Sequence, residues 1–349
     1  MPNPPAKPVP AGVTEALRSV IAEAGITENI DLVARILATG VAMGMDPADR
    51  LDLKITSAAL TEMRAAFRLF APYEDVPKVT IFGSARTHST DARYHSAARI
   101  AAALAEQGWM VVTGAGPGIM QAAAEGAGPA RSLGVSIRLP FEEKPNAVIG
   151  SSANNVAMKY FFTRKLMLVK ESKGFVCVPG GFGTLDEMFE LLTLQQTGKA
   201  EPTPIVLLDA PGGTFWTGLQ RFVDDQLVTS GVVSPDDFDR VLVTDSVAEA
   251  AEAITGFWRN YDSLRWVGRR LVLRLRTAPT EAEIADLNDR FGFLLAQGRI
   301  ERSGPLAPER NDGDRLDLPR LVLAFDQFRI GSLFRLIRAI NELPSAPGG

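Results

Sequence analysis

The sequence predicts an α/β fold: a Rossmann-like parallel sheet flanked by helices, with N-terminal accessory helices and a small C-terminal α+β module. Between residues 79 and 258, short runs that are apolar throughout alternate with helix-like stretches. Strands of this kind form parallel sheets that are buried on both faces. Glycine-rich turns follow several of the runs. Because ligands bind beyond the carboxyl ends of such strands, these turns indicate where a functional site lies.

Residues 1–75 are expected to form a proline-rich lead followed by accessory helices. Residues 1–11 are rich in proline, and helical apolar spacing runs from Val13 to about Phe70. The stretch "APYEDVP" then breaks the helical pattern. We therefore place the first domain boundary after residue 75.

Residues 76–262 are expected to form the central α/β domain. Its apolar runs predict strands at residues 79–83, 109–114, 134–140, 174–180, 204–209 and 240–245. The stretches between and after these runs predict helices at residues 91–108, 117–127, 161–172, 184–198, 214–231 and 247–258.

Residues 263–349 are expected to form a small α+β module. The pattern predicts strands at 269–276 and 318–325 and helices at 279–298 and 328–343, with a polar, loop-like segment at 301–319. The module contains no recognisable catalytic constellation. A regulatory or oligomerisation role and a plain structural addition both remain open.

The composition excludes several classes of protein. The net charge of -4 gives no electrostatic reason to expect a nucleic acid polymer or a membrane surface as partner. No apolar stretch approaches the ~18 residues of a membrane span, and the proline-rich start lacks an apolar signal core, so we expect a cytoplasmic protein. The single cysteine, Cys177, lies in an apolar run and is expected to be a buried core residue. Two histidines are too few for a histidine-rich metal site.

The glycine-rich turns have the properties of a phosphate cradle. A helix N-terminus presents unpaired N–H groups and partial positive charge, and glycine lets a phosphate approach the backbone closely. In "VPGGFGTLDEMFE", Gly180, Gly181 and Gly183 precede a helix expected to start near Thr184, whose hydroxyl adds a donor. The turn "TGAGPGIM" is a second candidate, but Ile119 stands where a dinucleotide motif requires its third glycine, and no P-loop motif occurs.

Two interpretations of the neighbouring charged residues stay open. Thr184 and Glu187 have the spacing of a capping box, in which the glutamate returns to the backbone at the start of its helix. The alternative is a chemical role for this carboxylate beside the cradle. Arg164 and Lys165 either belong to a solvated helix face or pair with an anion, because two cations in the apolar stretch "FFTRKLM" otherwise cost energy.

These stretches resemble the Lonely Guy (LOG) family. "PGGFGTLDE" matches its P-G-G-x-G-T-x-x-E signature, and "FFTRKLM" matches its R-K-x-x-M element. "IFGSAR", "TGAGPGIMQAAAEGA", "LPFEEKPN" and "FELLTLQQTGK" are similar to the longer, bacterial-type members. The resemblance covers residues 64–260 and neither the first 60 residues nor the C-terminal module. Members are cytokinin-activating phosphoribohydrolases and related purine nucleotide nucleosidases, often mislabelled lysine decarboxylases. Nothing in the sequence resembles the lysine-bearing site of a pyridoxal-dependent decarboxylase.

The resemblance implies a nucleotide-binding catalytic domain that hydrolyses the N-glycosidic bond of a purine nucleoside 5′-monophosphate, with adenine or an N6-modified relative as base. Carried over by position, Arg164 and Glu187 are the catalytic pair. A carboxylate near the ribose carbon C1′ can stabilise the positive charge that this carbon carries in the transition state. The implied substrate-binding residues are Gly83, Ser84, Gly114, Gly116, Gly118, Glu142, Asn146, Lys165, Gly180, Gly181, Gly183, Thr184 and Asp186.

The same resemblance implies no metal, no cofactor and a homodimer with its active site near the subunit contact. The alternative function is a non-catalytic binding protein on the same scaffold, either a nucleotide sensor or a carrier similar to molybdenum-cofactor carriers. The presence of both Arg164 and Glu187 favours the enzyme, because a pure binder has less need of the carboxylate.

Overall fold

A computed structural model describes residues 8–138, 145–150 and 153–348. The chain divides into two compact units, residues 1–64 and residues 65–349. The boundary falls inside helix α3 (Arg50–Phe70), which begins in the first unit and ends in the second. Each unit is described by itself.

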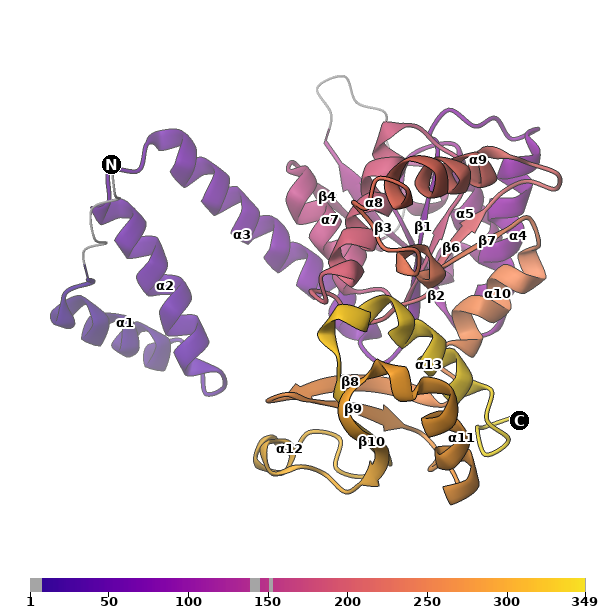
Figure 1. Cartoon of the computed structure of the whole chain (residues 1–349). Coiled ribbons are helices and arrows are strands. Elements are labelled where there is room, and N and C mark those ends of the chain that lie inside the picture. The colour runs from indigo at the N-terminus through magenta and orange to yellow at the C-terminus, as the bar shows by residue number, and fades with distance from the viewer. Residues whose placement is uncertain (1–7, 139–144, 151–152, 349) are drawn as a thin grey trace. The chain divides into compact units, whose positions relative to one another are not determined.

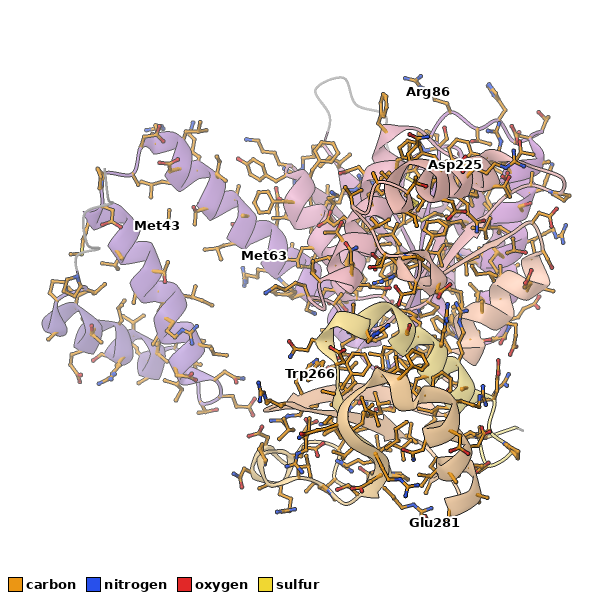
Figure 2. All side chains as sticks on the ribbon, in the orientation of Figure 1. Met43, Met63, Arg86, Asp225, Trp266 and Glu281 are labelled. Atoms are coloured by element: carbon orange, nitrogen blue, oxygen red, sulfur yellow. The ribbon has the colours of Figure 1, made fainter. Side chains whose placement is uncertain are left out.

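The first unit is helical, as expected from its apolar spacing. It contains α1 (Ala11–Glu23), α2 (Ile30–Met45) and the first part of α3 (Figure 1). Ile21 is the buried residue of α1, whereas α2 has none. The apolar side chains of α2, among them Met43 (Figure 2), are therefore exposed or only half buried.

A seven-stranded sheet forms the centre of the second unit, and every neighbouring pair of strands is parallel. The strand order is β4-β3-β2-β1-β5-β6-β7. The strands are β1 (Lys78–Phe82), β2 (Met110–Thr113), β3 (Ser132–Ile137), β4 (Asn155–Met158), β5 (Gly174–Cys177), β6 (Ile205–Leu208) and β7 (Val241–Thr244). This order confirms the predicted Rossmann-like α/β fold.

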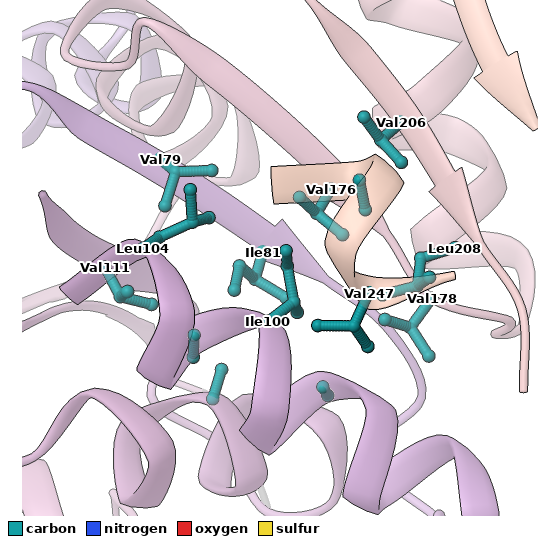
Figure 3. Close-up of a cluster of buried hydrophobic side chains, with 14 of the residues drawn as sticks. Val79, Ile81, Ile100, Leu104, Val111, Val176, Val178, Val206, Leu208 and Val247 are labelled. Carbon is teal, nitrogen blue, oxygen red and sulfur yellow. The ribbon is translucent and has the colours of Figure 1, made fainter. Parts of the chain in front are cut away.

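Helices α4 (Ala92–Glu106), α5 (Ile119–Ala127) and α10 (Val247–Gly256) cover one face of the sheet. Two of them begin at side-chain caps: Asp91 accepts a bond from the amide of Arg93, and Ser246 accepts one from the amide of Glu249. Between these helices and the strands lies a core of aliphatic side chains (Figure 3). Cys177 is fully buried in β5, so the expectation of a core cysteine is confirmed.

Helices α7 (Phe161–Lys170), α8 (Phe182–Gln196) and α9 (Phe215–Phe222) lie on the other side of the sheet (Figure 1). A π-helical turn at residues 223–228 continues α9. The short α6 (Ala147–Gly150) precedes the edge strand β4, and neither was predicted. In β4 only alternate residues are buried, so the strand lacks the continuous apolar run that identifies the others.

The C-terminal residues form a second, four-stranded antiparallel sheet in the order β10-β11-β9-β8. Its elements are β8 (Tyr261–Val267), β9 (Arg270–Leu275), α11 (Glu281–Phe291), β10 (Leu295–Ser303), α12 (Ala307–Asp312), β11 (Arg320–Phe325) and α13 (Leu333–Asn341). The predicted helix 279–298 is wrong beyond Phe291, where the chain turns into β10. The segment predicted as a loop contains the end of β10 and α12.

Hydrogen bonds tie α13 to the chain that leaves α10. The Asn341 side chain accepts from the amides of Asn260 and Tyr261 at 2.8 Å each and donates to the Phe257 carbonyl at 2.6 Å. Trp258 Nε1 donates to the Lys173 carbonyl at 2.7 Å. The boundaries at residues 75 and 262 stay predictions. Among the described residues, no helix is both long enough and apolar enough to cross a membrane.

Candidate active site

A cleft of about 670 Å³ opens at the carboxyl ends of β1, β2 and β5. β1 lies between β2 and β5, so the chain moves away from it in opposite directions along the sheet, and this is where α/β sheets hold ligands. The cleft is lined by residues 81–86, Gly114, Met120, Arg164, residues 180–185, Glu187 and Phe215.

The glycine turn after β5 leads directly into α8. The helix begins at Phe182 with Gly181 as its N-cap residue, and no described side chain caps it. Thr184 is therefore the third residue of the helix, and the predicted capping box at Thr184 and Glu187 is wrong. The amide of Leu185 makes the bond to the Gly181 carbonyl at 3.1 Å. The amides of residues 182–184 precede that bond and are available to an anion.

Packing requires glycine at one of the three glycine positions of this turn and leaves space for a side chain at the other two. A Cβ atom on Gly180 would lie 2.3 Å from Thr184 Oγ1, so packing against its own helix excludes a side chain there. A Cβ atom on Gly181 or Gly183 would meet nothing within 4 Å, and neither residue has a positive φ. Gly181 is the N-cap and Gly183 lies in the first turn of the helix, so both positions leave open space beside the helix start.

Arg164 reaches the cleft from α7. Its Nε donates to the carbonyl of Val135 in β3 at 3.0 Å, and its side chain is only 11% exposed. Its guanidinium packs directly on Gly114, where a Cβ atom would lie 1.9 Å from Nη2. Burial lowers the pKa of Arg164, and the Glu187 carboxylate opposes that shift.

Glu187 faces this cation from α8. Its Oε1 lies 3.9 Å from Arg164 Nη1, which is an ion pair without a hydrogen bond, and its side chain is 15% exposed. Burial raises the pKa of Glu187 to about 7, and Arg164 limits the rise. A carboxylate held this loosely beside one cation can turn its charge towards a bound ligand.

The raised pKa predicts a pH-dependent stability difference between the native protein and Glu187→Gln. Below the ordinary glutamate pKa of 4.5 the carboxyl is protonated in both folded and unfolded chains, so it costs nothing. As pH rises from 4.5 to about 7, the unfolded chain ionises this carboxyl while the folded chain keeps it protonated, so the native protein loses stability over this range. We expect Glu187→Gln to be more stable than the native protein by up to about 3 kcal/mol at pH 8, with the difference vanishing at pH 4.5. Urea unfolding at both pH values measures it, and a constant difference would contradict the account.

A protein-family model described as "Possible lysine decarboxylase" matches residues 118–254. The cytokinin riboside 5′-monophosphate phosphoribohydrolase of Mycobacterium tuberculosis is 32% identical over 161 residues, which are 45% of this chain and 82% of that protein. The chain belongs to the Lonely Guy family. The rice protein named probable cytokinin riboside 5′-monophosphate phosphoribohydrolase LOGL5 is 32% identical over 40% of this chain and 56% of its own length. LOG1 of Arabidopsis thaliana is 33% identical over 28% of this chain and 44% of its own length.

Among solved structures, the molybdenum cofactor binding protein of Rippkaea orientalis matches 51% of this chain and 94% of its own, with 20% identity and a TM-score of 0.36. The molybdenum cofactor carrier protein of Chlamydomonas reinhardtii matches with 22% identity and the same TM-score of 0.36. At this level of similarity neither structure bears on the ligand of the Lonely Guy chain.

Some residues expected to bind substrate lie outside the cleft lining. Lys165 follows Arg164 on α7 but points elsewhere: its Nζ lies 2.9 Å from Asp186 Oδ2 and also pairs with Glu190. Asp186 is largely exposed. These three residues join α7 to α8, so they hold together the helices that carry Arg164 and Glu187. Glu142 lies outside the described residues.

The turn after β2 serves mainly to shape the cleft. Gly118 has a φ of +67°, and the backbone amide of the next residue, Ile119, donates to the Ser84 carbonyl at 3.0 Å. Asn146 donates its side-chain amide to the Gly116 carbonyl at 3.1 Å. Of the residues predicted in this part of the chain, Gly83, Ser84 and Gly114 line the cleft, whereas Gly116, Gly118 and Asn146 do not.

Arg86, Met120 and Phe215 are among the cleft residues that the sequence did not reveal. Arg86 lies on the loop after β1 (Figure 2), and its place directly after the "FGSA" turn was an available signal. Met120 and Phe215 start or nearly start helices that follow β2 and β6, and no motif marks them. In the described part of the chain, no group of three or more His, Cys, Asp or Glu side chains is placed to hold a metal ion.

Proposed function

We propose that this protein hydrolyses the N-glycosidic bond of a purine nucleoside 5′-monophosphate to a free base and ribose 5-phosphate. The observation that carries the proposal is the meeting, in one cleft, of the uncapped N-terminus of α8 with the buried pair Arg164 and Glu187. The first feature suits a phosphate and the second suits a sugar that becomes cationic. The names of the curated relatives support the same reaction class.

The phosphate is proposed to bind at the start of α8. The amides of residues 182–184, the partial charge of the helix and the open space at Gly181 and Gly183 favour a bulky anion there. Glu187 follows Gly183 by four residues, about 6 Å along the helix, so a ribose attached to the phosphate extends towards the carboxylate. Phosphate binding thereby fixes the reacting carbon.

Cleavage then proceeds through an oxocarbenium-like state. The bond from C1′ to the base nitrogen breaks with its electron pair on the base, and the oxygen of a water molecule forms the new bond to C1′. The Glu187 carboxylate stabilises the positive sugar and accepts the proton from water, and Arg164 keeps that carboxylate ionised and oriented. The departing base takes up a proton. The reaction is a hydrolysis without electron transfer, so these residues require no redox cofactor.

Gly181→Asp is expected to block phosphate binding without unfolding the protein. The new side chain enters open space at an ordinary φ of -87°, and aspartate is a favourable N-cap residue. Its charge, however, repels a phosphate at the same amides. We expect KM for AMP to rise at least about tenfold, measured by steady-state base release. Gly181→Asn, a neutral side chain of the same size, is the matched control and should lose less; an unchanged KM in Gly181→Asp would place the phosphate elsewhere.

A comparison of AMP with adenosine tests the proposal as a whole. The protein should release adenine and ribose 5-phosphate in equal amounts from AMP, and much less adenine from adenosine, which lacks the phosphate. N6-modified AMP analogues in the same panel identify the preferred base. Binding of AMP without any base release would instead support the alternative, a nucleotide-sensing or carrier-like protein.

We infer a homodimer from the family resemblance, in the cytoplasm. Exposed apolar side chains on α7 and α8 next to the cleft are consistent with a subunit contact: Phe161, Phe162, Leu166, Phe182 and Phe189. Phe182, which is 93% exposed, immediately follows the N-cap of α8. Light scattering on the native chain and on Phe182→Ser measures whether this face contributes to assembly.

A further inference from the structure

Two adjoining cavities lie at the amino ends of the strands of the parallel sheet, opposite the carboxyl ends where the candidate active site opens. Their volumes are about 690 and 680 Å³, and their linings share Lys170, Ser172, Lys173, Trp258 and Arg315. Lys78 begins β1 and Lys173 directly precedes β5, which places them at these amino ends. Arg276 and Arg315 come from the C-terminal residues. We call these two spaces together the junction cavity.

Three cations gather around Trp258 in this cavity. Lys173 Nζ lies 5.0 Å from the centre of the Trp258 ring. Arg315 pairs with Asp262, but Lys173 and Arg276 have no ion pair with a described carboxylate. Arg315 and Arg276 are close enough to Lys173 for mutual repulsion, with Asp262 and Glu201 as the opposing charges. Like charges held together in this way favour an anionic partner.

Two other carboxylates of the lining are already paired with cations. Asp314 accepts from Arg265 at 2.8 Å and Arg274 at 2.6 Å, and Glu171 pairs with Lys170 at 2.7 Å. Glu74 and Asp75 line the first cavity together with Lys78. Lys78 in turn donates to the backbone carbonyls of Tyr73 and Val76. Lys173 and Arg276, beside Trp258, thus have no ion pair with a described carboxylate.

A buried polar group in the same lining points to a ligand with hydroxyl groups. Gln195 is 3% exposed and donates Nε2 to the Thr203 carbonyl at 2.8 Å. Its carboxamide oxygen is buried without a hydrogen-bond partner among the described residues. A buried acceptor in this state gains free energy when a donor reaches it.

We propose that the junction cavity is a second binding site, for a phosphorylated metabolite that carries hydroxyl groups, such as a sugar phosphate or a nucleotide. Lys173, Arg276 and Arg315 hold the phosphate, and Gln195 accepts a hydrogen bond from a hydroxyl. The site is separate from the cleft that binds the proposed substrate, because the two open at opposite ends of the same strands.

The test uses the full-length Gly181→Asp variant, so that the glycine turn of the cleft contributes no phosphate binding. Calorimetric titrations with ribose 5-phosphate and with pyrophosphate are compared with and without Lys173→Gln and Arg276→Gln together. We expect both probes to bind, and we expect the double substitution to weaken binding at least about tenfold. Gln195→Leu should weaken the binding of ribose 5-phosphate more than that of pyrophosphate, which has no sugar hydroxyl group.

The matched control is Arg270→Gln with Arg299→Gln, two exposed cations outside the cavity lining, which should leave binding unchanged. Tryptophan fluorescence gives a local readout that does not depend on catalysis. The probe should change the emission of the protein that keeps Trp258 and should not change that of Trp258→Phe. Equal binding by the Lys173→Gln, Arg276→Gln variant, or no binding of either probe, would overturn the proposal.

Discussion

Glu187→Gln is expected to leave a folded protein that releases adenine from AMP at least about a thousandfold more slowly than the native protein. The amide keeps the size of the side chain but carries no negative charge for the cationic sugar and no basic oxygen for the proton of water. The corrected start of α8 strengthens this prediction, because Glu187 does not cap the helix and its replacement removes no cap.

The measurement is single-turnover base release at pH 8, with thermal unfolding of the same samples. Glu106→Gln, which changes an exposed glutamate at the end of α4, is the control and should keep native activity. Native turnover in Glu187→Gln would remove the carboxylate from the mechanism. Loss of turnover together with a lower free energy of unfolding would show a structural role instead.

Gly114→Ala is expected to reduce turnover about a hundredfold although Gly114 belongs to neither helix α7 nor α8. The added methyl would lie 1.9 Å from Arg164 Nη2 and 2.9 Å from Met120 Sδ, so the guanidinium must leave its position. Glu187 then loses its ion pair with Arg164. The variant should therefore behave like Arg164→Ala, measured as kcat/KM for AMP.

A double substitution separates this explanation from a general disturbance of the turn. If Gly114→Ala acts through Arg164, adding it to Arg164→Ala should cause no further loss, because the two changes share one consequence. Gly218→Ala, a helix glycine with open space around its Cβ position, is the control and should be neutral. Additive losses in the double variant would contradict the assignment.

The parts of the fold that were predicted are those where burial leaves a continuous signal. Strands such as β5 and β6 are apolar at every position because helices cover both faces of the sheet. Strands β4, β8 and β10 were missed because each is partly exposed and carries polar residues, and Gly298 at a φ of +74° lies within β10, where the register with β11 shifts. Tertiary contacts, which local patterns do not contain, decide such strands.

The candidate site shows the same division. The motifs located the glycine turn, Arg164 and Glu187, which the structure brings into one cleft. They did not reveal that Lys165 and Asp186, neighbours of the pair in sequence, pair with each other outside the cleft lining. One residue along a helix rotates a side chain by about 100°, so adjacent signature residues face different surroundings. Phe215 enters the cleft from a helix with no motif of its own.

A crystal structure of Glu187→Gln with AMP tests the central claim most directly. The account predicts the phosphate on the amides of residues 182–184, the ribose C1′ facing the side chain at position 187, and the guanidinium of Arg164 beside it. A nucleotide bound with its phosphate away from the start of α8, or with C1′ turned from position 187, would contradict it.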